Sequence, residues 1–357
     1  MAARKSSPHA GRGVSAALLR WYDAHARALP WRVPPNVIRR ADPYRVWLSE
    51  IMLQQTTVAT VRPRFEQFLA RWPNVEALAA APLDEVLNEW AGLGYYARAR
   101  NLHQCARAIV ERGGFPETED GLLALPGVGA YTAAAIAAIA FDKKAVVVDG
   151  NIERVMARLF AIQEPLPSAK PVLKEAAALI WPQRRSGDFA QGLMDLGAGV
   201  CTPRAPNCAG CPLSRHCRAF ASGAPEDFPR RAPKKQKPTR YGASFALFDR
   251  NGRVLVERRP EKGLLGGMLG LPGTPWASDK PNGEARDAAP GRATWRHAGL
   301  ARHSFTHFHL ELEVYAGDAR QLKLADNQQW ADPKTVRLPT VMRKALAVAA
   351  KERESAA

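Results

Sequence analysis

The chain has 357 residues, of which 46% are hydrophobic, 24% charged and 8% aromatic. This composition is typical of globular proteins and excludes a disordered or collagen-like chain, while the length favours two or three domains. The 51 Lys and Arg residues against 34 Asp and Glu give a net charge of +17, which points to a polyanionic partner such as nucleic acid.

No apolar segment is long enough for a membrane span, because the longest, residues 130–141, falls short of the ~20 residues that a helix needs to cross a bilayer. Residues 1–13 are basic, and no apolar segment follows them, so we predict a disordered N-terminus rather than a secretory signal. We therefore expect no membrane partner, a reducing compartment such as the bacterial cytoplasm, where the protein would associate with the nucleoid, and free cysteines.

Residues 14–220 carry apolar side chains at helical spacing, and the segments end at Gly or Pro. In 102–110, for example, Leu102, Cys105 and Ile109 share one stripe, so Cys105 is expected to be a core thiol. We predict an all-α domain here.

Two carboxylates in this domain are candidates for catalysis. Glu50 lies in the apolar segment WLSEIML, where burial would raise its pKa and keep it protonated. Asp149 follows VVV and precedes a predicted helix; an ordinary N-cap is the simplest interpretation of this position. One protonated and one ionised carboxyl group is the pair that cleavage of a glycosidic bond requires.

Residues 125–141, LPGVGAYTAAAIAAIAF, predict a hairpin of two helices. Gly127 and Gly129, on either side of Val128, would supply positive φ angles and a close backbone approach. The exposed amides of the second helix would then bind a DNA phosphate without sequence preference. The alternative is a plain corner between helices.

A metal site is predicted at residues 201–217. Four thiolates at this spacing can hold a tetrahedral zinc or an iron–sulfur cluster, and spacing alone does not separate the two. The four are Cys201, Cys208, Cys211 and Cys217.

The second half of the chain follows a linker. Residues 221–240 contain four prolines and eight charged residues, too few apolar ones to form a core. From 241 to 350 the apolar period changes to two, as in the hairpin pattern ASFALF-DRNG-RVLVE, and a closing helix is expected at 340–350, with a tail at 351–357. Net charge is +8 for residues 1–225, +4 for 226–240 and +5 for 241–357.

The motifs LPGVGAY and VDGN and the four-cysteine loop resemble the helix-hairpin-helix DNA glycosylases of the endonuclease III superfamily. WLSEIMLQQT and AGLGYYARARNLH are similar to its adenine-excising branch, the MutY family. The resemblance implies two helical subdomains that hold double-stranded DNA, a [4Fe-4S] cluster rather than zinc, and a monomer. It implies that the substrate is adenine mispaired with 8-oxoguanine or guanine.

The resemblance also implies roles for single residues. Glu50 would protonate the adenine, and ionised Asp149 would stabilise the cationic sugar, with Tyr131 and Asn151 shaping that face. Since a lysine nucleophile stands at the place of Tyr131 in relatives that cut the strand, a monofunctional enzyme is expected. Further DNA contacts are implied for Tyr95 as the intercalating residue, Gln55 beside the estranged base, and Arg32 and Gln191 in the pocket, for which a phosphate contact and a helix surface are the alternatives.

The segment RRPEKGLLGGMLGLPG resembles a Nudix-type fold, so an α+β domain is expected at residues 241–350. The acids after Pro272 are too sparse to hold magnesium, which predicts a lesion-reading module instead of a nucleotide hydrolase. The matching recognition loop is Phe305, Thr306 and His307, although a histidine among aromatic residues is more often a core residue.

Two other functions remain open on the sequence. One is a related glycosylase that acts on thymine or oxidised pyrimidines, against which Gln54-Gln55 and the Nudix-like segment argue. The other is a DNA-binding regulator that uses the cluster as a redox sensor. The segment 33–44 is longer than the resemblance predicts, and its role is open.

Overall fold

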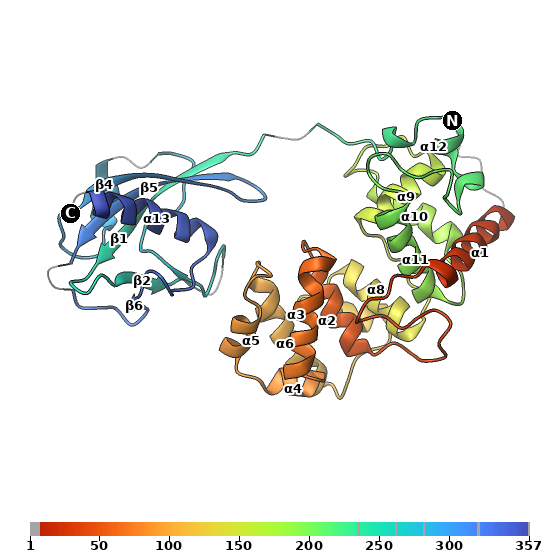
Figure 1. Ribbon diagram of the computed structural model, residues 1–357, viewed down its shortest axis with the longest axis horizontal. Coiled ribbons are helices and arrows are strands. Elements are labelled where there is room, and N and C mark those ends of the chain that lie inside the picture. The colour runs from red at the N-terminus through yellow and green to blue at the C-terminus, as the bar shows by residue number, and fades with distance from the viewer. Residues whose placement is uncertain (1–7, 234–235, 261–262, 281–282, 320–321, 356–357) are drawn as a thin grey trace. The chain divides into compact units, whose positions relative to one another are not determined.

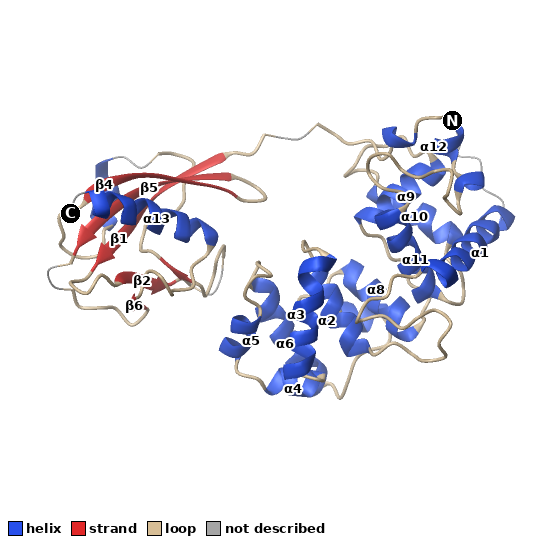
Figure 2. Ribbon diagram, viewed as in Figure 1, coloured by secondary structure: helices blue, strands red, loops and turns tan. Residues whose placement is uncertain are grey.

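The computed structural model describes residues 8–233, 236–260, 263–280, 283–319 and 322–355 (Figure 1). The chain divides into two compact units, Met1–Pro233 and Lys234–Ala357. The first unit is helical and the second holds the strands (Figure 2). An all-α domain followed by an α+β domain is thus confirmed.

The helices of the first unit begin where the sequence offers a cap. The side chains of Asp42, Thr57, Asn74, Thr118 and Asp149 each accept a hydrogen bond from a backbone N–H in the first turn. The helices are α1 (Pro8–His25), α2 (Pro43–Leu53), α3 (Val58–Arg71), α4 (Val75–Ala80), α5 (Leu83–Glu89), α6 (Ala97–Glu111), α7 (Glu119–Leu123), α8 (Ala130–Phe141), α9 (Gly150–Phe160), α10 (Lys170–Ile180), α11 (Ser186–Gly199) and α12 (Arg218–Ala221), with 3-10 turns at Ser214–His216 and Pro225–Asp227.

Helix α8 lies in the core of this unit and packs against α2, α7 and α11. Most of its side chains are alanines with almost no exposed surface, so neighbouring helices approach closely. A Cβ atom on Gly187 of α11 would lie 2.6 Å from the carbonyl oxygen of Ala138. Side chains of α2, α8 and α11 therefore border one common space.

Two predicted boundaries of this unit differ from the structure. Helix α1 begins at Pro8, inside the segment 1–13 that was expected to be disordered; residues 1–7 lie outside the described residues. The first part of the predicted linker 221–240 also packs onto the helical unit. Phe228 is buried in its core, and Leu166 N–H donates to Arg230 O at 2.8 Å. One apolar side chain and a few backbone hydrogen bonds suffice to hold a segment too polar to form a core alone.

The second unit is a mixed six-stranded sheet with the strand order β3-β2-β1-β5-β4, and β6 pairs with β2. β1 and β5 are parallel, and the other pairs are antiparallel. The predicted hairpin is confirmed, because residues 249–253 connect β1 and β2. The strands are β1 (Thr239–Phe248), β2 (Val254–Arg258), β3 (Leu269–Gly270), β4 (Arg296–Ser304), β5 (His309–Asp318) and β6 (Gln328–Ala331).

Helix α13 (Thr340–Ser355) packs against β1, β4 and β5. It extends past the predicted end at 350 into the expected tail, because Lys351–Ser355 contains no helix breaker. The segment after Pro272, where a magnesium-binding helix would be needed, forms a 3-10 turn at Gly283–Ala288.

Among the residues that the structure describes, no helix combines the length and the apolar character that a membrane span requires.

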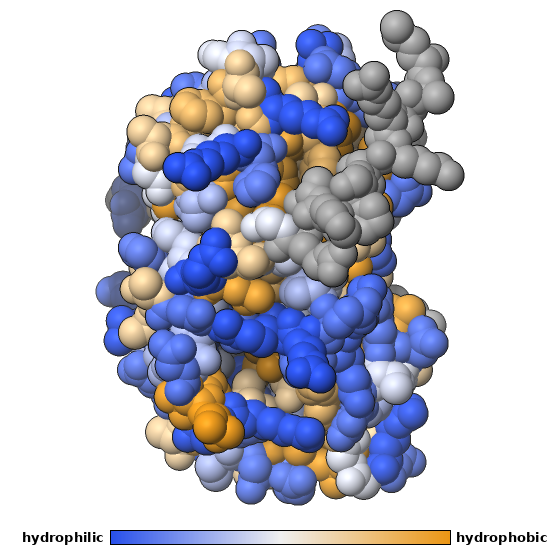
Figure 3. All heavy atoms as spheres, turned by 90° about the vertical axis from the view of Figure 1, so that its right-hand side faces the viewer, coloured by the Kyte–Doolittle hydropathy of each residue, from blue (hydrophilic) through white to orange (hydrophobic). Residues whose placement is uncertain are grey.

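On the face drawn in Figure 3, hydrophilic side chains form a band across the lower half, and hydrophobic ones are scattered around it.

Candidate active site

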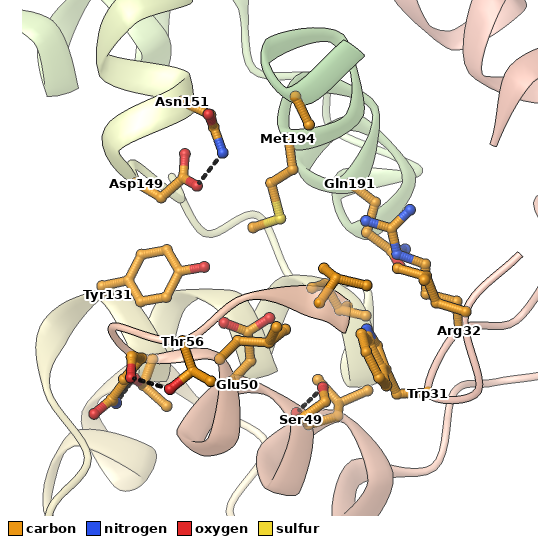
Figure 4. A pocket seen from close by; sticks show the side chains of 18 of the residues that line it. Trp31, Arg32, Ser49, Glu50, Thr56, Tyr131, Asp149, Asn151, Gln191 and Met194 are labelled. Carbon is orange, nitrogen blue, oxygen red and sulfur yellow. Dashed lines mark hydrogen bonds between the residues drawn. The ribbon is translucent and has the colours of Figure 1, made fainter. Parts of the chain in front are cut away.

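A cavity of about 810 Å³ opens in the helical unit. Most of the residues that the sequence predicts for catalysis and for the base pocket line it, including Glu50, Tyr131 and Asp149. Asp149, Asn151 and Tyr131 lie on one side of this cavity and Arg32 and Gln191 on the other (Figure 4). Residues far apart in the sequence thus surround a space of the size that small-molecule sites have.

Glu50 is held by α2 and is 7% exposed. Burial raises its pKa from 4.5 to about 7, and the negative charge of Asp149 acts in the same direction. A side-chain hydrogen bond with Tyr131 and the positive charge of Arg32 lower it. Near neutral pH the carboxyl group is therefore both an available acid and an available base.

Tyr131 stands in the first turn of α8 and faces Glu50. Burial, followed by the charges of Glu50 and Asp149, raises the pKa of its phenol well above the usual value. The hydroxyl group therefore stays protonated and can donate a hydrogen bond into the cavity. Gln54 Nε2 donates to Thr132 Oγ1 at 3.3 Å and ties the end of α2 to α8.

Asp149 is the N-cap of α9, and its Oδ1 accepts from Ile152 N–H at 2.7 Å. Its Oδ2 accepts from Asn151 Nδ2 at 3.2 Å. Burial raises the pKa of Asp149, whereas these hydrogen bonds and the charge of Arg154 lower it. The cap interpretation and a functional one are compatible here, because one carboxylate oxygen caps the helix while the group still lines the cavity.

Arg154 extends this network away from the cavity. Its Nη2 donates to Asn151 Oδ1 at 2.9 Å and to Gly197 O at 2.6 Å, and its Nε donates to Cys201 O at 2.8 Å. A Cβ atom on Gly197 would come within 2.7 Å of Asn151 Cβ, so only glycine lets α11 approach α9 this closely. The orientation of Asn151 is thereby fixed.

Arg32 is anchored on the other side of the cavity. Its Nη1 donates to Asp195 Oδ2 at 2.7 Å, and both side chains are nearly inaccessible to solvent. Arg27 Nε donates to the second oxygen of the same carboxylate. Gln191, one turn before Asp195 on α11, is buried, and its Nε2 donates to Gly187 O at 3.3 Å. Arg32 and Gln191 are thus parts of the cavity wall.

The predicted helical hairpin joins α7 to α8. Gly127 has φ +73°, and a Cβ atom there would lie 2.7 Å from Asn101 Cβ. The expectation of positive φ was wrong for Gly129, which has φ −89°, and a Cβ atom at this position would meet no other atom within 4 Å. Gly129 instead leaves the start of α8 uncovered, and Val128 between the two glycines is buried.

Gln55 and Tyr95 are exposed, and both have positive φ, 56° and 49°. Arg98 connects the two loops on which they lie. It donates to the carbonyl oxygens of Ile51 and Leu93, both at 2.9 Å, and its guanidinium lies 5.5 Å from the centre of the Tyr95 ring. Two strained backbone positions are therefore held by one half-buried cation.

The four cysteines of the predicted metal loop lie at the end of α11 and around the turn Ser214–His216. Within the described residues, no group of three or more His, Cys, Asp or Glu side chains could hold a metal ion. Burial, together with the charges of the other three thiols, raises the pKa of Cys211 to about 11, so the four side chains lie close enough to interact. The residue types are those that bind a four-iron cluster, in which each thiolate binds a different iron, although the four side chains are not grouped around one point here.

Arg158 holds this loop in place from α9. It is buried, and its Nη1 donates to Thr202 O at 2.7 Å and to Cys201 Sγ at 3.3 Å. Its Nε donates to Phe228 O at 3.1 Å. The fifth cysteine, Cys105, is buried in the core as expected.

The predicted lesion loop connects β4 to β5 in the second unit. Phe305 N–H donates to Phe308 O at 2.8 Å and closes a tight turn. Thr306 and His307 are exposed at its tip, so His307 is not a core residue. Phe305 packs against Trp276 and Phe308, with ring centres 5.7 and 4.9 Å away.

Sequence reasoning missed three residues of the helical unit. Asp195 anchors Arg32, Arg98 joins the two loops, and Arg154 orients Asn151. Only Arg154 had a signal, since it lies three residues after Asn151 on the same helical face. The other two act across long sequence separations that no local pattern reveals.

Comparison with known proteins agrees with this geometry. Residues 48–182 match the family model described as HhH-GPD superfamily base excision DNA repair protein, and residues 243–348 match a NUDIX domain. A solved structure of a thermostable thymine-DNA glycosylase is 32% identical, with a TM-score of 0.54, over 60% of this chain and 98% of its own. The fold and cavity therefore define a helix-hairpin-helix protein of the base-excision class.

Comparison with curated proteins indicates a narrower family. A human adenine DNA glycosylase is 38% identical over 84% of this chain and 65% of its own length. An adenine DNA glycosylase of Mycolicibacterium smegmatis is 43% identical over 58% of this chain and 70% of its own. The chain thus spans about two thirds of the length of these relatives. It belongs to the adenine DNA glycosylase family.

Proposed function

We propose that this protein is a base-excision-repair enzyme that hydrolyses the N-glycosidic bond of adenine in double-stranded DNA. The observation that carries this proposal is the pair of carboxyl groups in one cavity, of which Glu50 has a pKa raised to about 7. Hydrolysis of a glycosidic bond uses an acid of this kind together with a second carboxylate. Membership of the adenine DNA glycosylase family supports adenine as the base.

In the proposed reaction, the adenine leaves the duplex and enters the cavity, because the bond to be broken is not accessible in the stack. Glu50 donates its proton to the adenine ring, which makes the base a better leaving group. As the bond to the sugar breaks, the carboxylate of Asp149 stabilises the developing positive charge, held in place by Asn151. Water then adds to the sugar cation, and the proton that it loses passes to a carboxylate of the cavity, which balances the proton that left with the adenine. Tyr131 orients Glu50. Because this position holds a tyrosine and not a nucleophilic lysine, the enzyme would release the base without cutting the strand.

The substrate in this proposal is adenine opposite 8-oxoguanine or guanine. Exposed Tyr95 would intercalate where the flipped base leaves the stack, and exposed Gln55 would lie beside the estranged base. The hairpin of Gly127, Val128 and Gly129 would bind the DNA backbone. Thr306 and His307, exposed at the tip of their turn, would contact the oxidised base.

The cysteine loop would hold a [4Fe-4S] cluster. Its four thiols are the donor set of such a cluster, and Arg158 already donates to one of the sulfur atoms. When bound, the cluster would fix the loop, and it can exchange an electron. None of the proposed steps at Glu50 and Asp149 passes through it.

The proposal is tested with duplexes that carry adenine opposite 8-oxoguanine, guanine or thymine, and thymine opposite guanine. We expect free adenine from the first two and no strand cleavage without alkali. Glu50→Gln and Asp149→Asn should abolish base release and largely spare DNA binding. The assignment would fail if thymine, and no adenine, were released, or if either variant kept full activity.

A further inference from the structure

A small hollow in the second unit has no role in the proposed reaction. Its volume is about 250 Å³. The described residues that line it include two cations, an aromatic ring and a large exposed aliphatic side chain: Arg240, Arg259, Pro260, Gly263, Leu264 and Trp276.

Both arginines of the hollow stack on aromatic rings. The guanidinium of Arg259 lies 5.1 Å from the centre of the Trp276 ring, and that of Arg240 lies 4.6 Å from the centre of the Phe308 ring. Neither forms an ion pair within the part of the chain that the structure describes. Arg353, which stacks on Phe248 at 4.8 Å, differs because its Nε also donates to Asp318 Oδ1 at 3.1 Å.

A second feature of Arg259 also indicates a ligand at this place. Its Nε is buried and has no hydrogen-bond acceptor among the described residues. Burial lowers the pKa of this guanidinium, with Glu257 acting in the other direction. A buried donor without an acceptor costs free energy, and a bound anion at this place would remove that cost.

The hollow adjoins the turn that presents Thr306 and His307. Trp276 and Phe308, on which the two arginines stack, both pack against Phe305 of that turn. Arg240 is also paired with Leu310, the second residue of the strand that leaves the turn. A nucleotide contacted by the turn would therefore place its own backbone, or that of its neighbour, within reach of these cations.

We propose that this hollow binds a phosphate of the DNA strand that the turn contacts. Arg259 and Arg240 supply the charge, because guanidinium groups match the geometry of phosphate oxygens. Leu264 and Trp276 supply an apolar wall for the adjoining sugar. The inference rests on the proposed function in that the ligand is DNA and that the turn contacts the lesion-bearing strand, and it adds a fixed contact point on that strand.

The test compares the salt dependence of DNA binding by full-length variants. All are built on Glu50→Gln, so that the duplex with adenine opposite 8-oxoguanine stays intact. Arg259→Met keeps the apolar stem and removes the charge, and it should lower the slope of log K against log salt by about one, as expected for one lost phosphate contact. Arg259→Lys should retain the slope. Arg353→Met is the matched control, because it removes a stacked arginine whose charge is already compensated, and it should leave the slope unchanged.

The proposal is overturned if Arg259→Met leaves the slope unchanged, or if Arg353→Met lowers it equally. A third arm titrates free dGMP. If dGMP binds in an Arg259-dependent way while the DNA slope is unchanged, the hollow is a nucleotide site and the DNA assignment is wrong. Adenine release by the otherwise unaltered chain is measured separately, so failure of the hollow and failure of the proposed enzyme activity can be distinguished.

Discussion

Replacing Glu50 by glutamine should make the helical unit more stable at neutral pH while abolishing base release. The native side chain is almost fully enclosed, and its pKa is raised from 4.5 to about 7. Below pH 4.5 the carboxyl group is protonated in both the folded and the unfolded chain, so it carries no ionisation penalty. Between 4.5 and 7 the unfolded chain loses this proton and the folded chain keeps it, so stability falls as the pH rises.

The size of the destabilisation follows from the shift in the pKa of Glu50. At about 1.4 kcal/mol for each pKa unit, ionisation of Glu50 destabilises the fold by about 3 kcal/mol above pH 7. Glutamine has nearly the same shape and does not titrate. Urea unfolding of both proteins from about pH 4.5 to about pH 8, followed by helical circular dichroism, should therefore show a difference that grows with pH in favour of Glu50→Gln and levels off above 7. A difference that is flat over this range, or that decreases, would refute the raised pKa of Glu50 in the folded chain.

Three further variants test other parts of the site. Tyr131→Phe removes a hydrogen bond that lowers the pKa of Glu50, so the alkaline limb of the rate–pH profile should move to higher pH; a shift to lower pH would contradict this. Arg98→Ala should weaken duplex binding at least tenfold, measured by fluorescence anisotropy, because the loops carrying the intercalating side chains lose their common anchor; unchanged affinity would show that the anchor is dispensable. Gly127→Ala should lower the free energy of unfolding by about 1–3 kcal/mol, since φ +73° and a contact of 2.7 Å with Asn101 both disfavour a Cβ atom; a denaturation midpoint equal to that of the native chain would contradict it.

Local sequence patterns were enough to predict the helices, the strands and two carboxyl groups of the cavity wall, whereas Tyr131, Asn151, Arg32 and Gln191 were predicted from the family resemblance. Glu50 could be found because a charged residue in an apolar helix is unusual, and Asp149 because a cap after an apolar strand-like segment is a local signal. These inferences needed no knowledge of which helices pack together. The same holds for the hairpin at β1 and β2, whose turn residues are diagnostic.

The remaining features depend on contacts between distant segments. Asp195 pairs with Arg32 across more than half of the helical unit, and Arg98 reaches back to Ile51, so neither was recognisable from its neighbours. The packing of Phe228 was missed for a related reason, since a single apolar residue in a polar segment has no periodicity. Gly129 shows the opposite error: the residue type suggested a strained backbone, and its φ is ordinary.

The tie between α2 and α8 has a consequence for how the enzyme would select its base. Glu50 and Tyr131 stand on two helices that pack together and are cross-linked by Gln54 and Thr132, so the cavity is assembled before any ligand arrives. The protein then changes little in structure when it binds. The main free-energy cost of bringing a base into the cavity is that of unstacking and unpairing its nucleotide in the duplex. This cost is smallest where pairing is already weak. A rigid cavity of this kind would therefore select for adenines whose base pairs open easily. This preference would act even before any side chain contacts the opposite base.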